Sequence, residues 1–509
     1  MPDIPNTPDR PTTLRHLVAG EWVDGEGAEA HSTDPAHPDR AVAVYRTAGK
    51  TLLDQAVTAA QAAQPDWSAQ GLIQRGLVLR RAAALLADRA EEIALLMTRE
   101  EGKTLPESRA EVGASVETLY YHASRARAAD GATFPSAHPE EIIRTLRRPL
   151  GIVAAITPWN FPLQIPAWKI APALLWGNAV IWKPASDTVA VAAAFARVLA
   201  DAGVPAGVLN LLLAPGSVGA ALVAREEIAG VTFTGSVTVG RSIQAAAVPR
   251  GAKVQMELGG HNAAIVLPDA DPAAAAADLV AGAMGSTGQK CTGTRRIIAV
   301  AEAYDALVPE LKSRIEALVV GDGLADGVGI GPLVSGKARQ EVESAVEQAL
   351  SEGAQVLARA DAGPASGAES GSASAPASDG SCYYPPTLLA GHPGLTICHE
   401  EVFGPVTTLV RAADLDEAIR IANGTRFGLT AAVFTCDERA VRRCVEELDA
   451  GLVKANAPTT GSELHAPFGG LKDSSFPAPR EQNGDSGAEF FTWSKTAYLR
   501  TGTPARSRS

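Results

Sequence analysis

The chain has few cysteines and no long apolar run, and each absence excludes a class of protein. None of its five cysteines pairs as C-x-x-C, so we expect no disulfide framework, zinc ribbon or dithiol redox motif. No uncharged apolar stretch reaches the roughly 18 residues of a membrane helix. Residues 1–15 are polar and rich in Pro and Asp, unlike a secretory signal. We therefore expect a protein of the reducing cytoplasm, with no membrane segment and no metal.

Basic residues are also in the minority. There are 45 Lys and Arg against 57 Asp and Glu, which gives a formal net charge of −12. This balance opposes non-specific binding to nucleic acid or to anionic membranes, and no stripe of Lys and Arg offsets it. With 509 residues, of which 46% are hydrophobic and 20% charged, the chain has the composition of a globular protein with about two to four domains.

Ala-rich helical stretches alternate with short apolar runs rich in β-branched residues, the pattern of an α/β protein with parallel strands. The spacing predicts helices at 52–64, 77–98 and 189–202, and strands at 151–156, 179–182, 208–213 and 231–233. Strand, helix and strand repeating in this way predict a doubly wound sheet, the usual place for a nucleotide. A second α/β region follows from about 258 to 475. Inside it, residues 361–380 are almost entirely small or polar, and we interpret them as a disordered surface insertion without a catalytic part.

The most informative segment is 288–294, Gly-Gln-Lys-Cys-Thr-Gly-Thr, which contains Cys291. A free cysteine is usually a small buried hydrophobic residue. That interpretation is kept for the other four, Cys382, Cys398, Cys436 and Cys444. Around Cys291, however, glycines and other small residues let the backbone approach a substrate closely, and the neighbouring Lys290 favours a thiolate. This setting makes Cys291 a candidate nucleophile.

Two further segments carry candidate catalytic groups. Glu257 lies between apolar residues and precedes two glycines; it is either a surface carboxylate paired with a cation or a buried general base with a raised pKa. Asn160 follows a predicted buried strand, in a loop that the prolines at 158 and 162 hold rigid. It is either a turn residue that bonds its own backbone or an amide that donates to a developing oxyanion.

Taken together, these segments resemble those of the aldehyde dehydrogenase superfamily. In that family a Trp-Asn loop, a Lys-Pro strand end, a Phe-Thr-Gly-Ser turn, a Glu-Leu-Gly-Gly segment and a Cys follow in this order. The matching residues here are Trp159-Asn160, Lys183-Pro184, 233–236, 257–260 and Cys291, followed by 400–406 and 467–470. The similarity extends from about Trp22 to Tyr498, nearly the whole chain.

The resemblance implies a fold and a mechanism. Residues 15–127 and 151–256 would form a doubly wound NAD(P)-binding domain, and 257–475 an α/β catalytic domain. Segments 128–150 and 484–498 would be β-strands that join subunits into a homodimer or homotetramer by edge pairing. The Cys291 thiolate would attack the aldehyde, and the oxyanion would accept hydrogen bonds from Asn160 and the Cys291 N–H. Hydride transfer to the nicotinamide would leave a thioester, which water activated by Glu257 hydrolyses.

The resemblance also implies a cofactor site. The family does not use G-x-G-x-x-G, and that fingerprint is absent here. Instead, the turn with Gly235 and Ser236, and Gly240 in the helix after it, would bring backbone N–H groups to the pyrophosphate.

Four other residues belong to the expected cofactor site: Lys183 at the adenosine ribose, Glu401 at the nicotinamide ribose, and Phe403 and Trp159 beside them. Ser186 bears on the choice of cofactor. NAD-preferring relatives often have a Glu at this position, whose charge repels a 2′-phosphate, so the small neutral Ser186 favours NADP without excluding NAD.

The sequence constrains the identity of the aldehyde substrate less than that of the cofactor. Segments 459–461, 465–468 and 479–482 resemble those of bacterial semialdehyde dehydrogenases, above all enzymes for 2-oxoglutarate semialdehyde (2,5-dioxopentanoate). Succinate semialdehyde and aromatic or aliphatic aldehydes remain alternatives. The chain departs from the family at 471–475, and Glu481, at a shifted spacing, is left out of the catalytic set.

Two other functions were considered for the chain. A dehydrogenase that passes the thioester to coenzyme A typically lacks the general-base Glu, which is present here as Glu257. A non-enzymatic nucleotide-binding protein on the same fold would be expected to lose Cys, Glu or Asn, and all three are retained.

Overall fold

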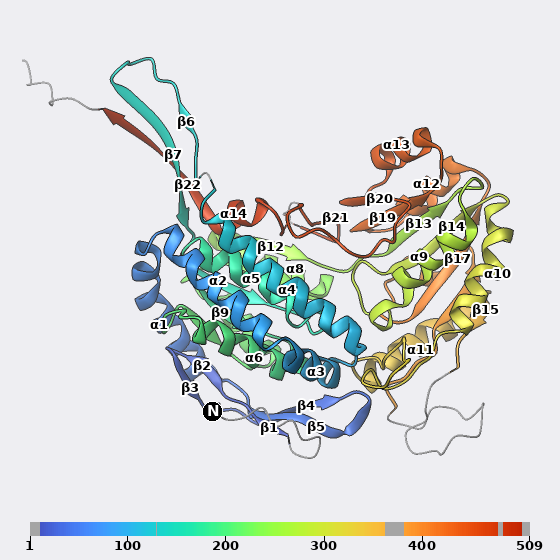
Figure 1. Cartoon of the computed structure of the whole chain (residues 1–509), viewed down its shortest axis with the longest axis horizontal. Helices are drawn as coiled ribbons and strands as arrows, with labels where there is room; N and C mark the ends of the chain where they lie inside the picture. Colours follow the sequence, from blue (N-terminus) through green and yellow to red (C-terminus); the bar gives the residue numbers. More distant parts are fainter. Residues whose placement is uncertain (1–10, 129, 362–380, 477–481, 501–509) are drawn as a thin grey trace, which may run out of the picture.

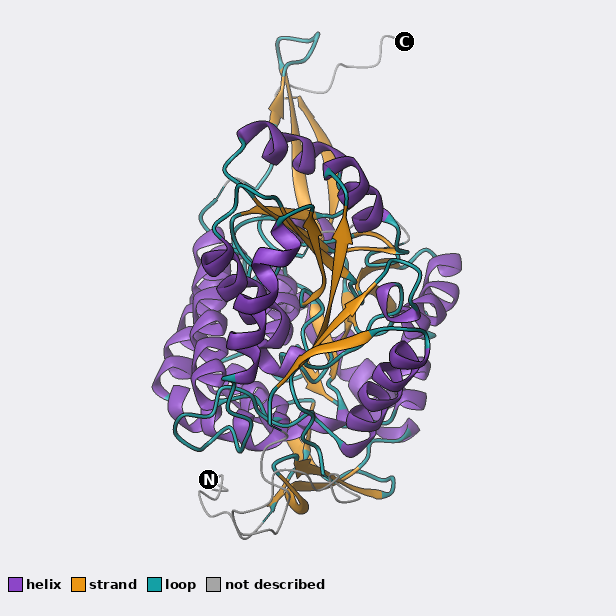
Figure 2. Cartoon of the chain, turned by 90° about the vertical axis from the view of Figure 1, so that its right-hand side faces the viewer, coloured by secondary structure: helices purple, strands orange, loops and turns teal. Residues whose placement is uncertain are grey.

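A computed structural model describes residues 11–128, 130–361, 381–476 and 482–500. The predicted insertion at 361–380 and Glu481 therefore lie outside the described residues, apart from Asp361. A seven-stranded sheet lies at the centre of each half of the structure (Figure 1), and helices flank the strands on both sides (Figure 2). Within the described residues, no helix is both long and apolar enough to cross a membrane.

The first sheet has the strand order β12-β11-β8-β9-β10-β2-β3. Its strands are β2 (His16–Val18), β3 (Glu21–Val23), β8 (Ile152–Ile156), β9 (Ala179–Lys183), β10 (Leu209–Leu211), β11 (Ile228–Thr234) and β12 (Lys253–Glu257). The strands β8 to β12 are parallel, and β2 and β3 extend the sheet in the antiparallel sense. The direction of winding reverses between β8 and β11, the position outside whose carboxyl ends such sheets bind nucleotides. The predicted doubly wound α/β fold is confirmed.

The helices of this half are α1 (Lys50–Ala69), α2 (Leu72–Asp88), α3 (Ala90–Glu101), α4 (Leu105–Arg125), α5 (Gln164–Leu175), α6 (Val189–Asp201), α7 (Gly216–Val223) and α8 (Val237–Ala247). The prediction of one helix over 77–98 is wrong, because the chain breaks between α2 and α3 at Arg89, which has φ −105° and ψ 14°. Both helices contribute to the same hydrophobic core, so the apolar spacing continues across the break. The strand expected at 208–213 is shorter and that at 231–233 longer than predicted.

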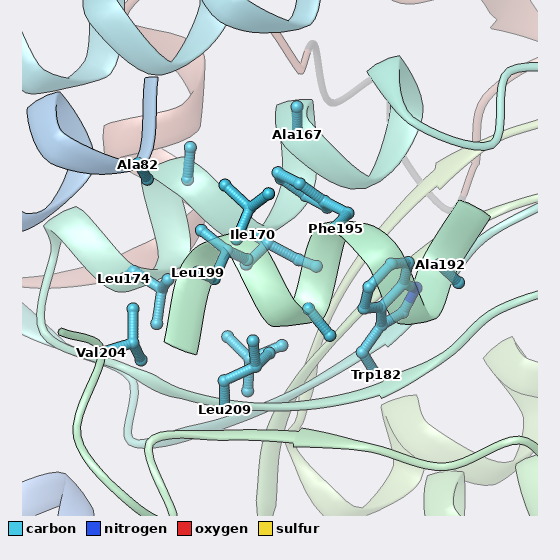
Figure 3. Packing of buried hydrophobic residues seen from close by; sticks show 14 of the residues in the cluster. Ala82, Ala167, Ile170, Leu174, Trp182, Ala192, Phe195, Leu199, Val204 and Leu209 are labelled. Atoms are coloured by element: carbon cyan, nitrogen blue, oxygen red, sulfur yellow. The ribbon is translucent and has the colours of Figure 1, made fainter. Parts of the chain in front are cut away.

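Figure 3 shows part of the hydrophobic core of this half, which includes Trp182 and Phe195. Trp182 of β9 and Phe195 of α6 are fully buried, with their rings edge to face at 6.0 Å. The Trp182 indole N–H also donates to Thr157 Oγ1 at 2.9 Å, just beyond the end of β8. A helix buried on nearly all sides, such as α6, must be apolar all round, which accounts for its Ala and Val content.

The second sheet has the order β15-β16-β17-β14-β13-β19-β20, parallel except for β15. Its strands are β13 (Asn262–Val266), β14 (Thr294–Val300), β15 (Gln355–Arg359), β16 (Thr387–Gly391), β17 (Val406–Ala412), β19 (Thr430–Phe434) and β20 (Leu452–Ala455). The helices around it are α9 (Pro272–Met284), α10 (Ala303–Glu316), α11 (Gly336–Ser351), α12 (Leu415–Asn423) and α13 (Glu438–Glu447). Residues 258–261 join the carboxyl end of β12 to the start of β13, so the two sheets meet at these edges.

Three small sheets complete the fold: β1 (Thr12–Thr13) with β5 (His37–Arg46) and β4 (Glu29–Asp34); β18 (Phe427–Gly428) with β21 (Leu471–Lys472); and β22 (Thr492–Arg500) with β7 (Glu141–Pro149) and β6 (Thr133–Phe134). The last of these projects from the body in Figure 1. The prediction that 484–498 is a strand throughout is wrong, because β22 is preceded by a short helix, α14 (Ser486–Phe491). Phe490 and Phe491 are both buried, whereas consecutive residues of a strand point to opposite faces.

Candidate active site

Cys291 lies in a loop, 288–293, that joins the turn η3 (Gly285–Gly288) to β14. The loop belongs to no sheet, so its carbonyl groups need other partners. Each of its six carbonyl oxygens accepts a hydrogen bond from a side chain, at 2.6 to 3.0 Å. In chain order, the donors are Arg295 to Gly288, Asn160 to Gln289, Arg295 to Lys290, Asn262 to Cys291, Thr459 to Thr292 and Asn262 to Gly293.

The backbone ahead of this loop is held in a strained conformation. Ser286 and Thr287 have φ values of 52° and 55°, a region that residues with a Cβ rarely occupy. Gly288 follows at φ 66°, and a Cβ there would lie 2.0 Å from the carbonyl oxygen of Gly404. Only glycine fits at this position, which explains the glycine three residues before the cysteine.

The Cys291 thiol is surrounded by carboxylates and one cation. Burial raises the pKa of the thiol, and Glu401 and Glu257 raise it further, whereas Arg295 lowers it. From the sequence, Lys290 is expected to supply the positive charge that favours the thiolate. In the structure, Lys290 faces Lys103 and the carboxylates around it, Glu107 first among them.

Asn160 is 4% exposed and lies against the nucleophile loop. Its side-chain Nδ2 donates to the Gln289 carbonyl at 2.9 Å. An amide nitrogen has two N–H groups, so one remains for a second acceptor. The structure thus places an amide donor beside the residues that precede Cys291, and its action on an oxyanion stays a prediction.

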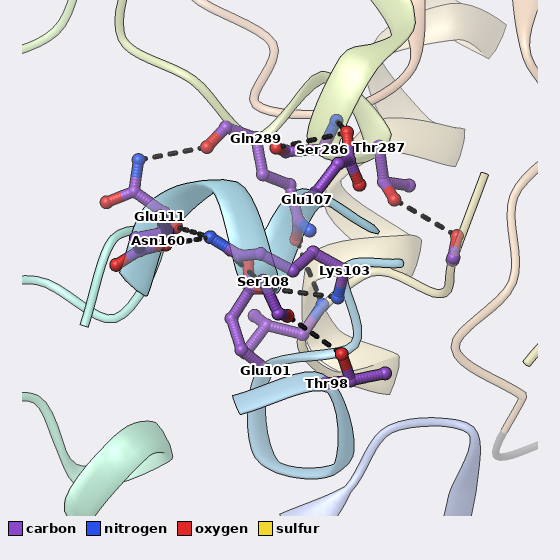
Figure 4. A network of polar contacts seen from close by, with 12 residues as sticks. Thr98, Glu101, Lys103, Glu107, Ser108, Glu111, Asn160, Ser286, Thr287 and Gln289 are labelled. Carbon is purple, nitrogen blue, oxygen red and sulfur yellow. Dashed lines mark hydrogen bonds and ion pairs between the residues drawn. The ribbon is translucent and has the colours of Figure 1, made fainter. Parts of the chain in front are cut away.

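A buried network holds the Asn160 loop from behind (Figure 4). Lys103 Nζ donates to the Asn160 carbonyl at 2.7 Å and pairs with Glu111 at 2.6 Å. The other oxygen of Glu111 accepts from the backbone N–H groups of Leu163 and Gln164 at 2.9 and 3.1 Å. Sequence reasoning missed Lys103 and Glu111, because a charged stretch around 100–111 looks like a solvated helix end.

The same network reaches the nucleophile loop. Glu107 accepts a 2.6 Å hydrogen bond from the backbone N–H of Ser286 and also completes the capping box of α4 with Thr104. One helix start is therefore connected both to the strained turn before Cys291 and, through Lys103, to the Asn160 loop.

Glu257 ends β12 and is 2% exposed. Lys169 of α5 is fully buried near it and donates to Thr232 Oγ1 at 3.0 Å and to Gln482 Oε1 at 2.7 Å. Burial lowers the pKa of Lys169 to about 7, and the charge of Glu257 acts in the opposite direction. Lys169 was not among the predicted residues, although it is the one charged residue of α5, whose other residues apart from Gln164 are apolar.

The turn after β11 forms a cradle for an anion. Gly235 leaves β11, and a Cβ there would lie 2.5 Å from the Phe233 ring. Ser236 caps the 11-residue helix α8 by accepting from the Val239 N–H. Gly240 lets α8 pack against Leu258, next to Glu257, where a Cβ would approach to 3.0 Å. The free N–H groups at this helix start suit a pyrophosphate.

Lys183 and Ser186 lie at the neighbouring strand end. Lys183 ends β9, and its stem passes Gly219 of α7, where a Cβ would lie 3.1 Å away. Ser186 opens the turn η1 (Ser186–Thr188) and is exposed. Burial raises the pKa of the adjacent Asp187, while the positive charge of Lys183 lowers it. The sequence alone does not show that this carboxylate lies beside Lys183.

Glu401 and Phe403 approach from the second sheet. Glu401 accepts the Gly260 N–H at 3.2 Å, and a Cβ on Gly259 would lie 2.1 Å from its carboxylate. Burial raises the pKa of Glu401 to about 7, and Arg295 opposes that shift. Phe403 packs edge to face on Trp159, with ring centroids 5.6 Å apart.

The predicted catalytic residues, with Glu401 and Phe403, thus lie around the nucleophile loop, and the other predicted cofactor residues lie at or just beyond the carboxyl ends of β8, β9 and β11. The glycine cradle, the open helix start, and a lysine and a carboxylate on opposite sides fit a dinucleotide. Across the parts of the chain that the structure describes, no group of three or more His, Cys, Asp and Glu could hold a metal ion.

Comparison with known proteins agrees with this geometry. The profile of the Aldehyde dehydrogenase family matches residues 22–497. The chain belongs to the aldehyde dehydrogenase family. It is an NAD(P)-dependent oxidoreductase that oxidises an aldehyde to the carboxylate, and the resemblance predicted from its motifs is confirmed.

Individual relatives cover nearly the whole chain. The chain is 39% identical over 490 residues to the alpha-ketoglutaric semialdehyde dehydrogenase of Bacillus subtilis, covering 96% of this chain and 98% of that protein. Betaine aldehyde dehydrogenase of Staphylococcus aureus, solved with NAD+, has a TM-score of 0.89 at 29% identity, covering 97% and 96%. A 3,6-anhydro-L-galactose dehydrogenase solved with NAP has a TM-score of 0.89 at 32% identity, covering 96% and 100%.

We predict that Lys103→Met impairs both stability and turnover. The variant leaves Glu101 and Glu111 buried without their cation, which typically costs about 3–5 kcal/mol of unfolding free energy. It also releases the Asn160 carbonyl, so kcat should fall by roughly ten- to a hundredfold. Urea unfolding and steady-state kinetics measure the two effects.

The control for this variant is Arg109→Met, which removes an exposed ion pair between α4 and Glu91 of α3. It should leave both quantities close to those of the unmodified protein. Unchanged stability in Lys103→Met would contradict the role assigned to the network.

Proposed function

We propose that this enzyme oxidises a semialdehyde that carries a carboxylate, of the 2-oxoglutarate semialdehyde class, and uses Cys291 as nucleophile. The arrangement that supports the mechanism is the loop 288–293, which accepts a hydrogen bond from the Asn160 amide and whose Cys291 thiol is close enough to the Glu257 carboxylate to feel its charge. Support for the substrate class comes from the likeness to the Bacillus subtilis semialdehyde dehydrogenase over nearly the full chain.

In the first half of the reaction, the Cys291 sulfur forms a bond to the aldehyde carbon. The carbonyl oxygen becomes an oxyanion, which the second N–H of Asn160 and the backbone N–H of Cys291 stabilise. Both donors are fixed in advance, because Asn160 is bonded to Gln289 and Asn262 to the Cys291 carbonyl. The nicotinamide, when bound, accepts the hydride that converts the adduct to a thioester.

In the second half, Glu257 removes a proton from the water that attacks the thioester, and the Cys291 sulfur leaves with the electron pair. Lys169, buried beside Glu257, stabilises the charged carboxylate that this step requires. The water supplies the oxygen of the carboxylate product, so coenzyme A is not needed.

For the cofactor, we propose that Gly235, Ser236 and Gly240 hold the pyrophosphate at the start of α8. Lys183 binds at the adenosine ribose and Glu401 at the nicotinamide ribose. Phe403 and Trp159 pack as a pair beside the nicotinamide end of the site, which keeps the two loops that carry them together.

We also propose that the subunits assemble into a homodimer or homotetramer through the projecting sheet. Its strands expose apolar side chains that a partner would cover. They are Phe134, Ile142, Trp493, Tyr498 and Leu499, each between 41% and 66% exposed.

The activity is tested by following reduced cofactor at 340 nm with 2-oxoglutarate semialdehyde, succinate semialdehyde, benzaldehyde and propanal. We expect turnover without coenzyme A, the highest kcat/KM with 2-oxoglutarate semialdehyde, and loss of at least about 10³-fold in Cys291→Ala. Higher kcat/KM for an uncharged aldehyde would contradict the substrate class. Turnover only with coenzyme A would contradict the role of Glu257, and nucleotide binding without any turnover would favour a binding protein.

For cofactor preference we propose NADP over NAD, because the neutral and exposed Ser186 leaves room for a 2′-phosphate beside Lys183. Ser186→Glu should lower kcat/KM for NADP by about tenfold or more and leave that for NAD within about threefold. Asp187→Asn should act in the opposite direction, since it removes a negative charge near the same phosphate. The measurement is the ratio of kcat/KM with NADP to kcat/KM with NAD for each variant. An unchanged ratio in Ser186→Glu would contradict the role of Ser186 in cofactor preference.

A further inference from the structure

Arg295 occupies an unusual position directly beneath the nucleophile loop. The residue is 3% exposed, and its Nη2 donates to the carbonyls of Gly288 and Lys290 at 2.6 and 3.0 Å. Its Nη1 donates to the Gly404 carbonyl at 3.0 Å, in the loop that follows Glu401. One planar guanidinium therefore spans the nucleophile loop and the loop proposed to hold the nicotinamide ribose.

Its flat face adds a further contact. The Arg295 guanidinium lies over the Phe403 ring, with 5.7 Å between its carbon and the ring centroid. Since Phe403 packs on Trp159, and Trp159 precedes Asn160, the cation is also connected to the loop that carries the amide donor. Movement of the nucleophile loop or of the loop after Glu401 would break contacts that Arg295 makes, and movement of the Asn160 loop would break the contact between Trp159 and Phe403.

The charge of Arg295 matters as much as its hydrogen bonds. Glu401 and Glu257 raise the pKa of the Cys291 thiol, whereas the positive charge of Arg295 lowers it. Lys169 acts on Glu257 instead. Without Arg295, the thiolate would have to form next to two carboxylates in a site largely shielded from water, where such repulsion is strong.

We propose that Arg295 is a positioning residue that fixes the Cys291 loop against the Glu401 loop and supplies the positive charge that favours the Cys291 thiolate. The proposal rests on Cys291 being the nucleophile. It assigns Arg295 two separable effects, one on thiol reactivity and one on the cofactor loop.

The chain offers a matched control in the next residue. Arg296 is 2% exposed and also makes three hydrogen bonds to carbonyl oxygens, but its partners are His261, Ile421 and Ala422, away from the nucleophile loop. If replacing either arginine lowers the reactivity of Cys291 equally, the effect comes from the loss of a buried residue and of stability. If only the replacement of Arg295 lowers it, the effect comes from the contacts of Arg295 with the site.

The experiment measures the rate of Cys291 alkylation by iodoacetamide as a function of pH, without cofactor or aldehyde, by mass spectrometry of the peptide that contains Cys291. In Arg295→Met, the rate at pH 8 should fall by about tenfold or more, with the titration displaced to higher pH. In Arg296→Met, it should stay within about twofold. Equal profiles in folded Arg295→Met and Arg296→Met would overturn the proposal.

Arg295→Lys separates the two effects and also serves if the Met variant does not fold. It keeps the charge but cannot make the three hydrogen bonds at once. We expect alkylation within about threefold of the unmodified protein, with KM for the cofactor raised by about tenfold. A Lys variant unchanged in both measurements would overturn the positioning role. Because alkylation needs no turnover, it still tests Arg295 if the substrate assignment fails.

Discussion

The rest of the site depends on one constraint: a buried loop without regular secondary structure must find hydrogen-bond partners for its backbone. The carbonyls of residues 288–293 find them in the side chains of Asn160, Asn262, Arg295 and Thr459. Asn160 comes from the first half of the molecule and the other donors from the second, so the full set of bonds requires both halves. The bonds that satisfy the loop also place the amide, the cation and the sulfur within one small volume, so the reactive geometry follows from the demands of folding.

The candidate catalytic residues could be predicted because each lies in a segment whose residue types would destabilise the fold, or be unusual, unless they served a function. A cysteine among glycines, a lone glutamate after an apolar strand and an asparagine between prolines are visible without a structure. The buried cations are not. Lys103, Lys169 and Arg295 look like ordinary charges in the sequence, and their partners are distant: Lys103 bonds to Asn160, and Lys169 to Gln482. Only the fold shows that these charges are buried.

The fold was predictable to the same extent. Apolar runs identify β8, β9 and β11 because parallel strands are buried on both faces. The break between α2 and α3 at Arg89 does not disturb the apolar spacing, since both helices pack on one core. Likewise, the aromatic residues before β22 suit a strand as well as a helix. They form the helix α14 because both of them pack into the hydrophobic core. The spacing of apolar residues shows which positions are buried. Where a helix breaks, and whether a short apolar segment is a helix or a strand, depends on contacts with residues distant in the sequence.

The most direct test of the account is whether an acyl group forms on Cys291. Glu257→Gln should still complete the first half of the reaction but hydrolyse the thioester slowly. Incubated with NADP and 2-oxoglutarate semialdehyde, then acid-quenched, its mass should rise by one acyl group located on the peptide that contains Cys291. The double variant with Cys291→Ala should show no increase. Reduced cofactor formed without any adduct, or an adduct on another cysteine, would contradict the assignment of Cys291 as nucleophile and Glu257 as the base that releases the product.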